Sequence, residues 1–270
     1  MIAVTSSLAR VAEPPSKGAR PGAEEGFVDK DLLVLGANAP EMELLRARLG
    51  RMGYRAVPAK TPDQARSFLR VAGGRVGAVV VPSDLPVMNL RSALLSLRTL
   101  SSGDDLAFLA GGRDPGAEGR RRLREAGVDL AVFDPCDTHT LRFQVNRALA
   151  GDKRTRGRRR TVRAPADWPV VIHTGTGRVK EGRVYSISAS GVFVTVQQPC
   201  MTRAKVTLDL AVPEGGRVSA TGRVVMTNVP GNVMRRSLPF GMGVQFDHLS
   251  EAVSVSFLVY AQERFRSLSL

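Results

Sequence analysis

The feature that most restricts the fold of this chain is a regular alternation of short apolar runs with longer segments of helical period between residues 31 and 150. Each run is long enough for one buried strand, and each following segment is long enough for one helix. The expected strands are 31–36, 54–59, 76–82, 105–111 and 129–134, and the expected helices are 39–53, 61–74, 89–101, 115–126 and 138–150. Because parallel neighbours need a crossover, these units predict a five-stranded parallel doubly wound sheet with helices on both faces.

The second half of the chain has a different pattern. Segments of alternating apolar and polar residues are joined by turns that contain glycine or proline, and they are 167–175, 178–188, 191–196, 203–212, 217–229 and 238–248. Sequential antiparallel strands of this kind are typical of a small barrel or sandwich. The next segment has apolar residues spaced along one helix face, namely Val253, Phe257, Tyr260 and Ala261. This spacing predicts a C-terminal helix that packs on or beside the strands.

These patterns divide the chain into a disordered leader, an α/β domain, an arginine-rich linker and a β domain with its helix, at 1–29, 30–150, 151–166 and 167–270. The leader combines proline, glycine and charges and has no signal-peptide cleavage pattern. No run approaches the roughly 18 apolar residues of a membrane helix. The two cysteines, Cys136 and Cys200, lack the spacing of a disulfide framework or a zinc site. We therefore expect a cytoplasmic protein without a membrane span.

The order and lengths of the units in the α/β domain resemble the response-regulator receiver domain. That resemblance implies a phosphoryl-transfer site with an acidic pair, an acceptor aspartate, a hydroxyl residue and a lysine. The corresponding residues here are Gly36, Ala37, Pro82, Ala110 and Asp134. Phosphoryl transfer needs a carboxylate nucleophile, a metal cage and a cation together. We interpret the domain as a non-phosphorylatable pseudo-receiver that contacts a protein partner.

The linker contains the run "RTRGRRRTVRAP", which begins at Arg154 and concentrates positive charge just before the first β segment. Most such runs are solvated linkers that repel themselves. The alternative is a guanidinium clamp for phosphates or guanine edges. A formal net charge of +14 for the whole chain favours anionic partners without saying which.

An arginine cluster before a six-stranded β unit, followed by "SISASG" and then "GMGVQF" on the last strand, resembles the PilZ domain. The resemblance implies a six-stranded antiparallel β-barrel with a C-terminal helix that binds the bacterial second messenger cyclic di-GMP (c-di-GMP). The family's RxxxR and [D/N]xSxxG motifs would assign the ligand site to Arg159, Arg160, Arg163, Ser186, Ser188 and Gly191.

The chemistry of these residue types agrees with that assignment. Guanidinium groups pair bidentately with phosphate oxygens or with guanine O6 and N7, and they stack on purine faces. The Ser188 hydroxyl can accept from guanine, and Gly191 allows a tight backbone turn beside the ligand. The chain departs from the family at Ser186, where a hydroxyl replaces the aspartate or asparagine.

Other chemistry-bearing residues favour structural interpretations. The three histidines, His139, His173 and His248, lack metal-ligand spacing, which predicts surface or packing roles. Trp168 at a strand start is typical of the anchor of a small core. The sequence has no nucleophile elbow, P-loop or dinucleotide fingerprint, so we expect neither an enzyme nor a cofactor or metal site.

Three functional hypotheses follow. The first is a c-di-GMP-binding signalling effector in which ligand on the barrel alters the contacts of the pseudo-receiver. The second is a ligand-free scaffold for protein–protein interaction. The third, less favoured because aromatic residues make up only 5% of the chain, is a nucleic-acid-binding protein. The sequence leaves the partner and the oligomeric state open.

Overall fold

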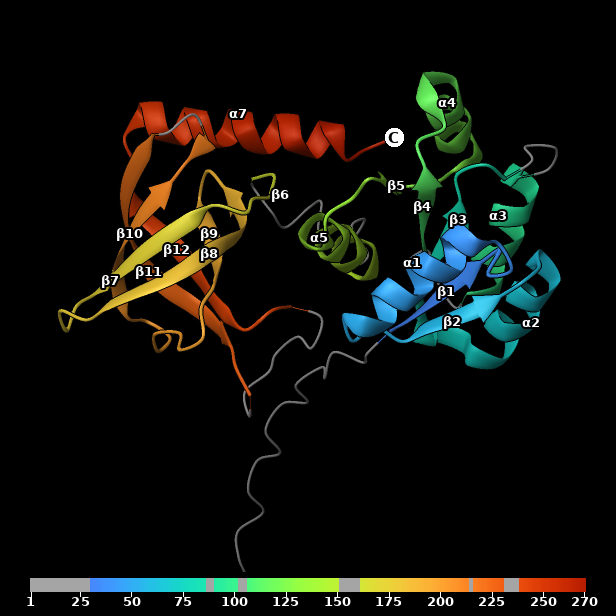
Figure 1. Cartoon of the computed structure of the whole chain (residues 1–270), viewed down its shortest axis with the longest axis horizontal. Helices are drawn as coiled ribbons and strands as arrows, with labels where there is room; N and C mark the ends of the chain where they lie inside the picture. Colours follow the sequence, from blue (N-terminus) through green and yellow to red (C-terminus); the bar gives the residue numbers. More distant parts are fainter. Residues whose placement is uncertain (1–29, 86–89, 102–105, 151–160, 214–215, 231–237) are drawn as a thin grey trace, which may run out of the picture.

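The computed structural model of the chain describes residues 30–85, 90–101, 106–150, 161–213, 216–230 and 238–270. They form an α/β domain and a β-barrel domain, and the long helix α7 (Glu251–Ser267) extends from the barrel towards the α/β domain (Figure 1). The predicted leader, 1–29, lies outside the described residues.

The first domain contains a five-stranded parallel sheet, which confirms the predicted fold. Its strands are β1 (Asp31–Leu35), β2 (Ala56–Ala59), β3 (Val76–Pro82), β4 (Ala107–Arg113) and β5 (Leu130–Asp134). They lie in the order β2-β1-β3-β4-β5, and every pairing is parallel. Strand β3 is buried along its whole length. A central strand covered on both faces therefore has a continuous apolar run instead of an alternating one.

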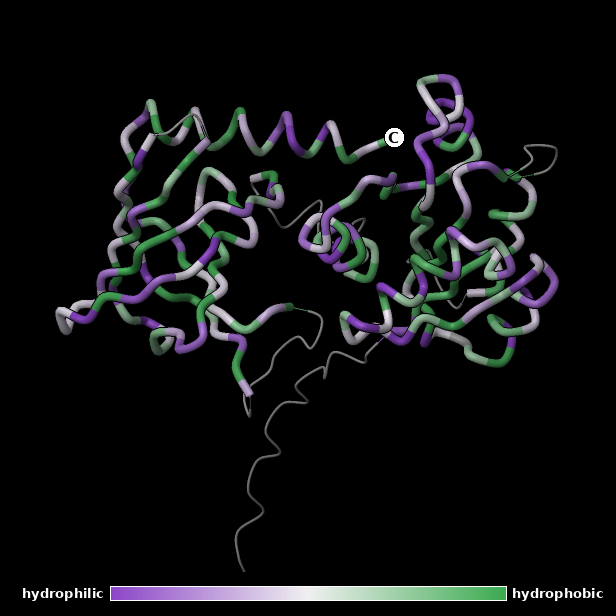
Figure 2. The backbone as a smooth tube through the Cα atoms, in the orientation of Figure 1, coloured by the Kyte–Doolittle hydropathy of each residue, from purple (hydrophilic) through white to green (hydrophobic). Residues whose placement is uncertain are grey.

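Helices cover both faces of this sheet. They are α1 (Pro40–Arg51), α2 (Pro62–Ala72), α3 (Leu90–Leu100), α4 (Gly116–Ala126) and α5 (Thr138–Leu149), with a short 3-10 turn, η1 (Gly73–Arg75), after α2. Helices α1 and α5 pack in one apolar cluster and α2, α3 and α4 in another, one on each face. Figure 2 shows hydrophobic residues gathered along the strands and hydrophilic residues on the outer helices and turns. Across the described residues, no helix combines the length and apolar character that crossing a membrane requires.

The second domain is an antiparallel barrel. Its strands are β6 (Ala164–Pro165), β7 (Pro169–Thr174), β8 (Val179–Ser188), β9 (Gly191–Thr195), β10 (Lys205–Ala211), β11 (Arg217–Asn228) and β12 (Gly241–His248). They lie in the order β6-β8-β7-β10-β11-β12-β9, and a further pairing of β8 with β9 closes the barrel. The six longer strands confirm the prediction. The two-residue strand β6, at the end of the predicted linker, was not foreseen.

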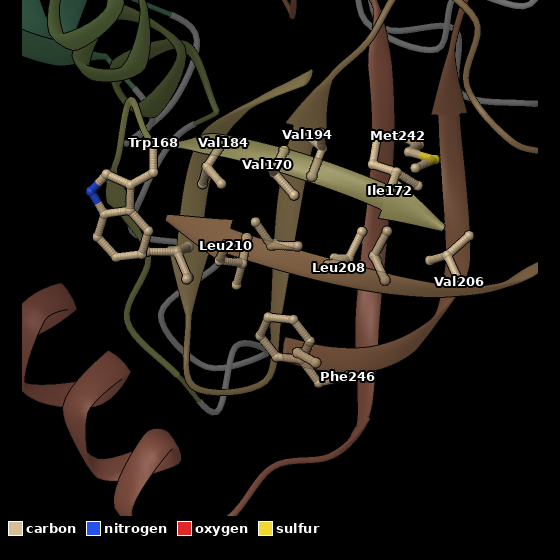
Figure 3. Close-up of a cluster of buried hydrophobic side chains, with 14 of the residues drawn as sticks. Trp168, Val170, Ile172, Val184, Val194, Val206, Leu208, Leu210, Met242 and Phe246 are labelled. Atoms are coloured by element: carbon tan, nitrogen blue, oxygen red, sulfur yellow. The ribbon is translucent and has the colours of Figure 1, made fainter. Parts of the chain in front are cut away.

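The barrel interior is filled by alternate side chains of its strands, as Figure 3 shows for Val170, Ile172 and Leu208. Helix α7 closes one side of this core with Phe257, which is 2% exposed. Trp168 belongs to the same core and makes an edge-on ring contact with Tyr260 of α7, with ring centroids 4.7 Å apart. Both the predicted C-terminal helix and the predicted structural role of Trp168 are confirmed.

Candidate functional site

The end of the arginine-rich segment lies against the turn between β8 and β9. Thr161 Oγ1 lies 2.9 Å from Ser190 Oγ in that turn. Shortly after Thr161, β6 pairs with β8 so that Pro165 is opposite Ser186. Arg163 lies between these two attachments and is partly buried. Arg163, the last arginine of the RxxxR motif, therefore belongs to a segment that is held against Ser186, Ser188 and Gly191, which we call the serine motif.

Strand β8 carries one extra residue just before the serine motif. Val184 pairs with Val194 of β9, but Ser186 pairs with the very next residue of β9, Phe193, so Tyr185 has no opposite partner in this ladder. Such a β-bulge redirects the side chains that follow it. The bulge therefore sets which face of the barrel the two motif serines occupy.

The two motif serines lie on the outer face of the barrel wall. Ile187 between them is part of the barrel core, and neighbouring residues of a strand point to opposite faces. Although they point away from the core, Ser186 is only 5% exposed and Ser188 is fully buried. The motif is thus covered in this structure.

The hydroxyl of Ser188 is used within the turn, because its Oγ donates to Gly191 O at 3.1 Å.

Gly191 is needed for a reason that sequence reasoning did not identify. A Cβ on Gly191 would lie 2.5 Å from Val244 O of β12. Close approach of β9 and β12, and not a left-handed turn, therefore requires glycine here.

Four of the six predicted site residues can be placed: Arg163, Ser186, Ser188 and Gly191. They come from the end of β8, the start of β9 and the segment leading into β6, which are neighbours in the barrel wall. The other two, Arg159 and Arg160, lie outside the described residues.

Pro82 stands where the resemblance to receivers would place the acceptor aspartate. Gly36 has a φ of +72°, and a Cβ on it would lie 2.8 Å from Pro82 Cγ. Asp134, at the position expected for lysine, accepts a hydrogen bond of 3.2 Å from Arg48 Nη1. The ring of Pro82 therefore stands against the residue where the resemblance would place a metal-binding carboxylate.

The three histidines have separate surroundings. His173 Nε2 lies 2.8 Å from Asp209 Oδ2, and hydrogen bonds from Ser219 and His173 lower the pKa of Asp209. His248 is exposed at the end of β12. His139 is partly buried in α5. Within the part of the chain that the structure describes, no three His, Cys, Asp or Glu side chains converge as a metal site requires.

Sequence reasoning missed the importance of Tyr185. Its side chain is 4% exposed, and it contacts α5 of the first domain through His139 and Asn146. Burial raises the pKa of Tyr185 above its usual range. The sequence does contain one indication of an irregularity at Tyr185. The core residues Val184 and Ile187 are three apart, which breaks the two-residue period of a regular strand.

Residues 157–258 match the family model of the PilZ domain. The match begins in the arginine-rich segment and ends inside α7, so it includes every barrel strand and the serine motif. No curated protein matches the chain.

Several solved structures are similar to parts of the chain. The inhibitor of motility of Bacillus subtilis (MotI/DgrA) is 19% identical, with 40% of this chain and 52% of that protein covered, at a TM-score of 0.35. The PilZ domain with c-di-GMP of YcgR from Escherichia coli is 12% identical, with 41% and 95% covered, at 0.33. The chemotaxis protein CheY4 of Vibrio cholerae is 17% identical, with 44% and 98% covered, at 0.38. The chain spans about half of the length of the Bacillus protein.

Proposed function

Because residues 157–258 form a PilZ domain, a family of c-di-GMP receptors, we propose that this chain is a c-di-GMP-binding signalling effector. In this proposal the ligand binds at Arg159, Arg160, Arg163 and the serine motif. Its binding alters the contacts of the receiver-like domain. The protein acts by binding and not by catalysis.

One observation carries the proposal: the arginine segment ends directly beside the serine motif. The contact between Thr161 and Ser190 and the pairing of Pro165 with Ser186 hold the end of the arginine-rich segment against the serine motif, although the two are more than twenty residues apart in the sequence. Arg163 lies between the two contacts. A ligand that needs both guanidinium and hydroxyl groups would therefore find both residue types at one end of β8.

The chemistry of c-di-GMP suits this pair of motifs. Its two phosphodiesters are anionic, and its guanines present O6 and N7 acceptors that a guanidinium fork recognises bidentately. Guanine also offers N1 and N2 donors, which hydroxyl and carbonyl oxygens can accept. Arginine suits such a site better than lysine, since only arginine combines a planar fork with stacking.

The first domain supports a role in contacts. In a phosphorylatable receiver, a carboxylate pair holds the metal beside the acceptor aspartate, whereas here Gly36 and Pro82 are packed against each other. We therefore propose that this domain is the output surface of the effector and does not accept phosphate.

Isothermal titration of the full chain with c-di-GMP tests the proposal, with GMP as the ligand control. We expect saturable heat with c-di-GMP, lost in Arg163→Ala and in Arg159→Ala. The matched control is Arg178→Ala, which removes an exposed arginine from the turn between β7 and β8 and leaves both motifs intact. Equal affinities in wild type and in both motif variants would contradict the assignment of the site.

A ligand-free interaction scaffold is the second candidate. Two observations favour it: both motif serines are buried, and the Ser188 hydroxyl is already bonded to Gly191 O. Absence of heat with c-di-GMP in wild type would give this candidate first place. Retention on DNA that falls steeply as salt is raised would instead identify a nucleic-acid-binding protein.

A further inference from the structure

Helix α5 of the receiver-like domain holds the residue that precedes the serine motif. The carbonyl oxygen of Tyr185 accepts two hydrogen bonds, one from Ala166 N at 3.3 Å and one from His139 Nε2 at 2.7 Å. A carbonyl only accepts, so the His139 ring carries its proton on Nε2. The backbone of the bulge is thus held jointly by its own barrel and by the other domain.

The side chain of Tyr185 is held by the same helix. Asn146 Nδ2 donates to Tyr185 Oη at 3.0 Å, and Tyr54 Oη donates to Asn146 Oδ1 at 2.8 Å. The Tyr185 ring also meets the rings of His139 and Phe143, with centroids 4.8 and 6.4 Å apart. Together these contacts form what we call the α5 clasp: His139, Phe143 and Asn146 on Tyr185.

The end of α7 attaches to the same helix separately. Gln144 Nε2 donates to Leu268 O at 2.6 Å, and the Arg147 guanidinium lies 3.7 Å from the centre of the Phe265 ring. These contacts hold the two domains together without touching β8. A change at Tyr185 can therefore loosen the clasp while α7 keeps the domains joined.

We propose that the α5 clasp is an autoinhibitory contact, in which docking of the receiver-like domain and binding of c-di-GMP to the serine motif oppose each other. This inference rests on the proposed function. His139 and Asn146 would act as positioning residues of the ligand site, although they belong to the other domain and contact Tyr185, the residue before the serine motif.

The sign of the coupling follows from burial. With the clasp formed, Ser186 and Ser188 are 5% and 0% exposed, so neither hydroxyl faces a ligand. Contact with c-di-GMP requires this end of β8 to shift, and the clasp holds the residue directly before it at both its carbonyl and its side chain. By linkage, any change that weakens the clasp increases the affinity for c-di-GMP, and binding of c-di-GMP weakens the clasp by the same free energy.

Calorimetry on full-length variants tests the coupling. Tyr185→Phe removes only the hydroxyl that Asn146 reaches, and Asn146→Ala removes the amide. Loss of one hydrogen bond from the clasp is expected to tighten c-di-GMP binding by about two- to tenfold. Asn146→Asp, whose carboxylate accepts from the hydroxyls of both Tyr54 and Tyr185, should keep the affinity of the wild type. Tyr54→Phe is the matched control, because it removes one hydroxyl from Asn146 but leaves the contact with Tyr185.

Hydrogen exchange gives the reciprocal measurement. Saturating c-di-GMP should increase amide exchange in α5 of the wild type, and the increase should be smaller in Tyr185→Phe, whose clasp is already loosened. Binding of equal strength in wild type, Tyr185→Phe and Asn146→Ala, with no change in α5 on ligand addition, would overturn the coupling and leave the proposed function intact. Absence of binding in every variant would overturn both.

Discussion

Gly36 and Pro82 are so close that the first has no room for a side chain: a Cβ on Gly36 would lie 2.8 Å from Pro82 Cγ. Gly36 also has a φ of +72°, in the left-handed region that favours glycine. Two separate penalties therefore oppose any carboxylate at this position, one from the backbone and one from the proline ring.

Gly36→Ala should consequently destabilise the α/β domain more than a glycine substitution that meets only the backbone penalty. Gly53→Ala provides that comparison, since Gly53 has a φ of +89° and open space around its Cβ position. We expect Gly36→Ala to lower the free energy of unfolding by about 1–3 kcal/mol more than Gly53→Ala. Thermal unfolding checks this, and adding Pro82→Ala should remove most of the difference.

The same geometry predicts that the domain does not accept phosphate. Incubation of the chain with acetyl phosphate and Mg²⁺ should leave its intact mass unchanged, because Gly36 and Ala37 stand where the resemblance would place the carboxylate pair that holds the metal. Pro82→Asp alone should behave in the same way, since Gly36 and Ala37 still supply no ligand. A phosphorylated wild-type protein would show that the interpretation as a pseudo-receiver is wrong.

Gly191 is expected to be essential for the barrel independently of any ligand. Gly191→Ala places a Cβ 2.5 Å from Val244 O, and this backbone contact cannot be relieved by a side-chain rotation. We expect a loss of about 1–3 kcal/mol in the free energy of unfolding. Gly175→Ala is the control, because its nearest atom would lie 4.0 Å away, and it should change stability by less than about 0.5 kcal/mol. Chemical denaturation of the two variants compares them directly.

Ser186→Asp should tighten binding of c-di-GMP by roughly tenfold, because a charge-assisted hydrogen bond to guanine is worth about 1.5–3 kcal/mol. The ligand-free variant should melt at a lower temperature than the wild type, since the new carboxylate replaces a side chain that is 5% exposed. Titration calorimetry and melting curves provide the two measurements. The gain should vanish in an Arg159→Ala background, and Thr176→Asp, in the exposed turn after β7, should leave the affinity unchanged.

The contact between His139 and Tyr185 should weaken in acid. Burial lowers the pKa of His139 from its ordinary value of 6.5, although the hydrogen bond to Tyr185 and the carboxylates of Asp167 and Asp137 oppose this shift and Arg183 adds to it. The undocked ring therefore binds a proton more readily than the docked one. The contribution of His139 to docking is therefore present in full above about pH 6.5 and is lost as pH falls through the lower pKa of the docked state.

Amide exchange of α5 between pH 7.5 and pH 5 should consequently show loss of protection in acid, after correction for intrinsic exchange rates. Asp137 and Asp167 stay ionised over this range, because their pKa values are lowered from 3.8. His139→Gln keeps a donor but cannot titrate, so its profile should be flat. The same loss of protection in His139→Gln would assign the pH dependence to another group.

Most of the architecture could be predicted because burial leaves a periodic pattern in the sequence. The continuous apolar run of β3 and the helical spacing of Phe257 and Ala261 both report directly on what each residue packs against. Trp168 could be assigned to the core because a large apolar ring at the start of a strand is typically buried in a small domain. These inferences depend on local neighbours only.

The remaining features depend on contacts between distant segments, which leave no local period. Strand β6 has two residues, one of them Pro165, so it is too short to show alternation. Gly191 could be assigned to the ligand motif, but the reason it must be glycine is the approach of β12, more than fifty residues later in the chain. The contact between Asn146 and Tyr185 joins two domains and could not be read from either one alone.

Because of its extra residue, Tyr185, β8 contributes to the barrel core and to the contact with the α/β domain through different residues. Val184 and Ile187 face the barrel interior on either side of it, and the ladder to β9 would become regular if Tyr185 were absent. Deletion of Tyr185 would therefore leave the side chains of the barrel interior in place and remove the residue of β8 that α5 contacts. For a gene that fuses two domains, this means that attachment through β8 can be acquired or lost by a single insertion or deletion, without redesign of the barrel.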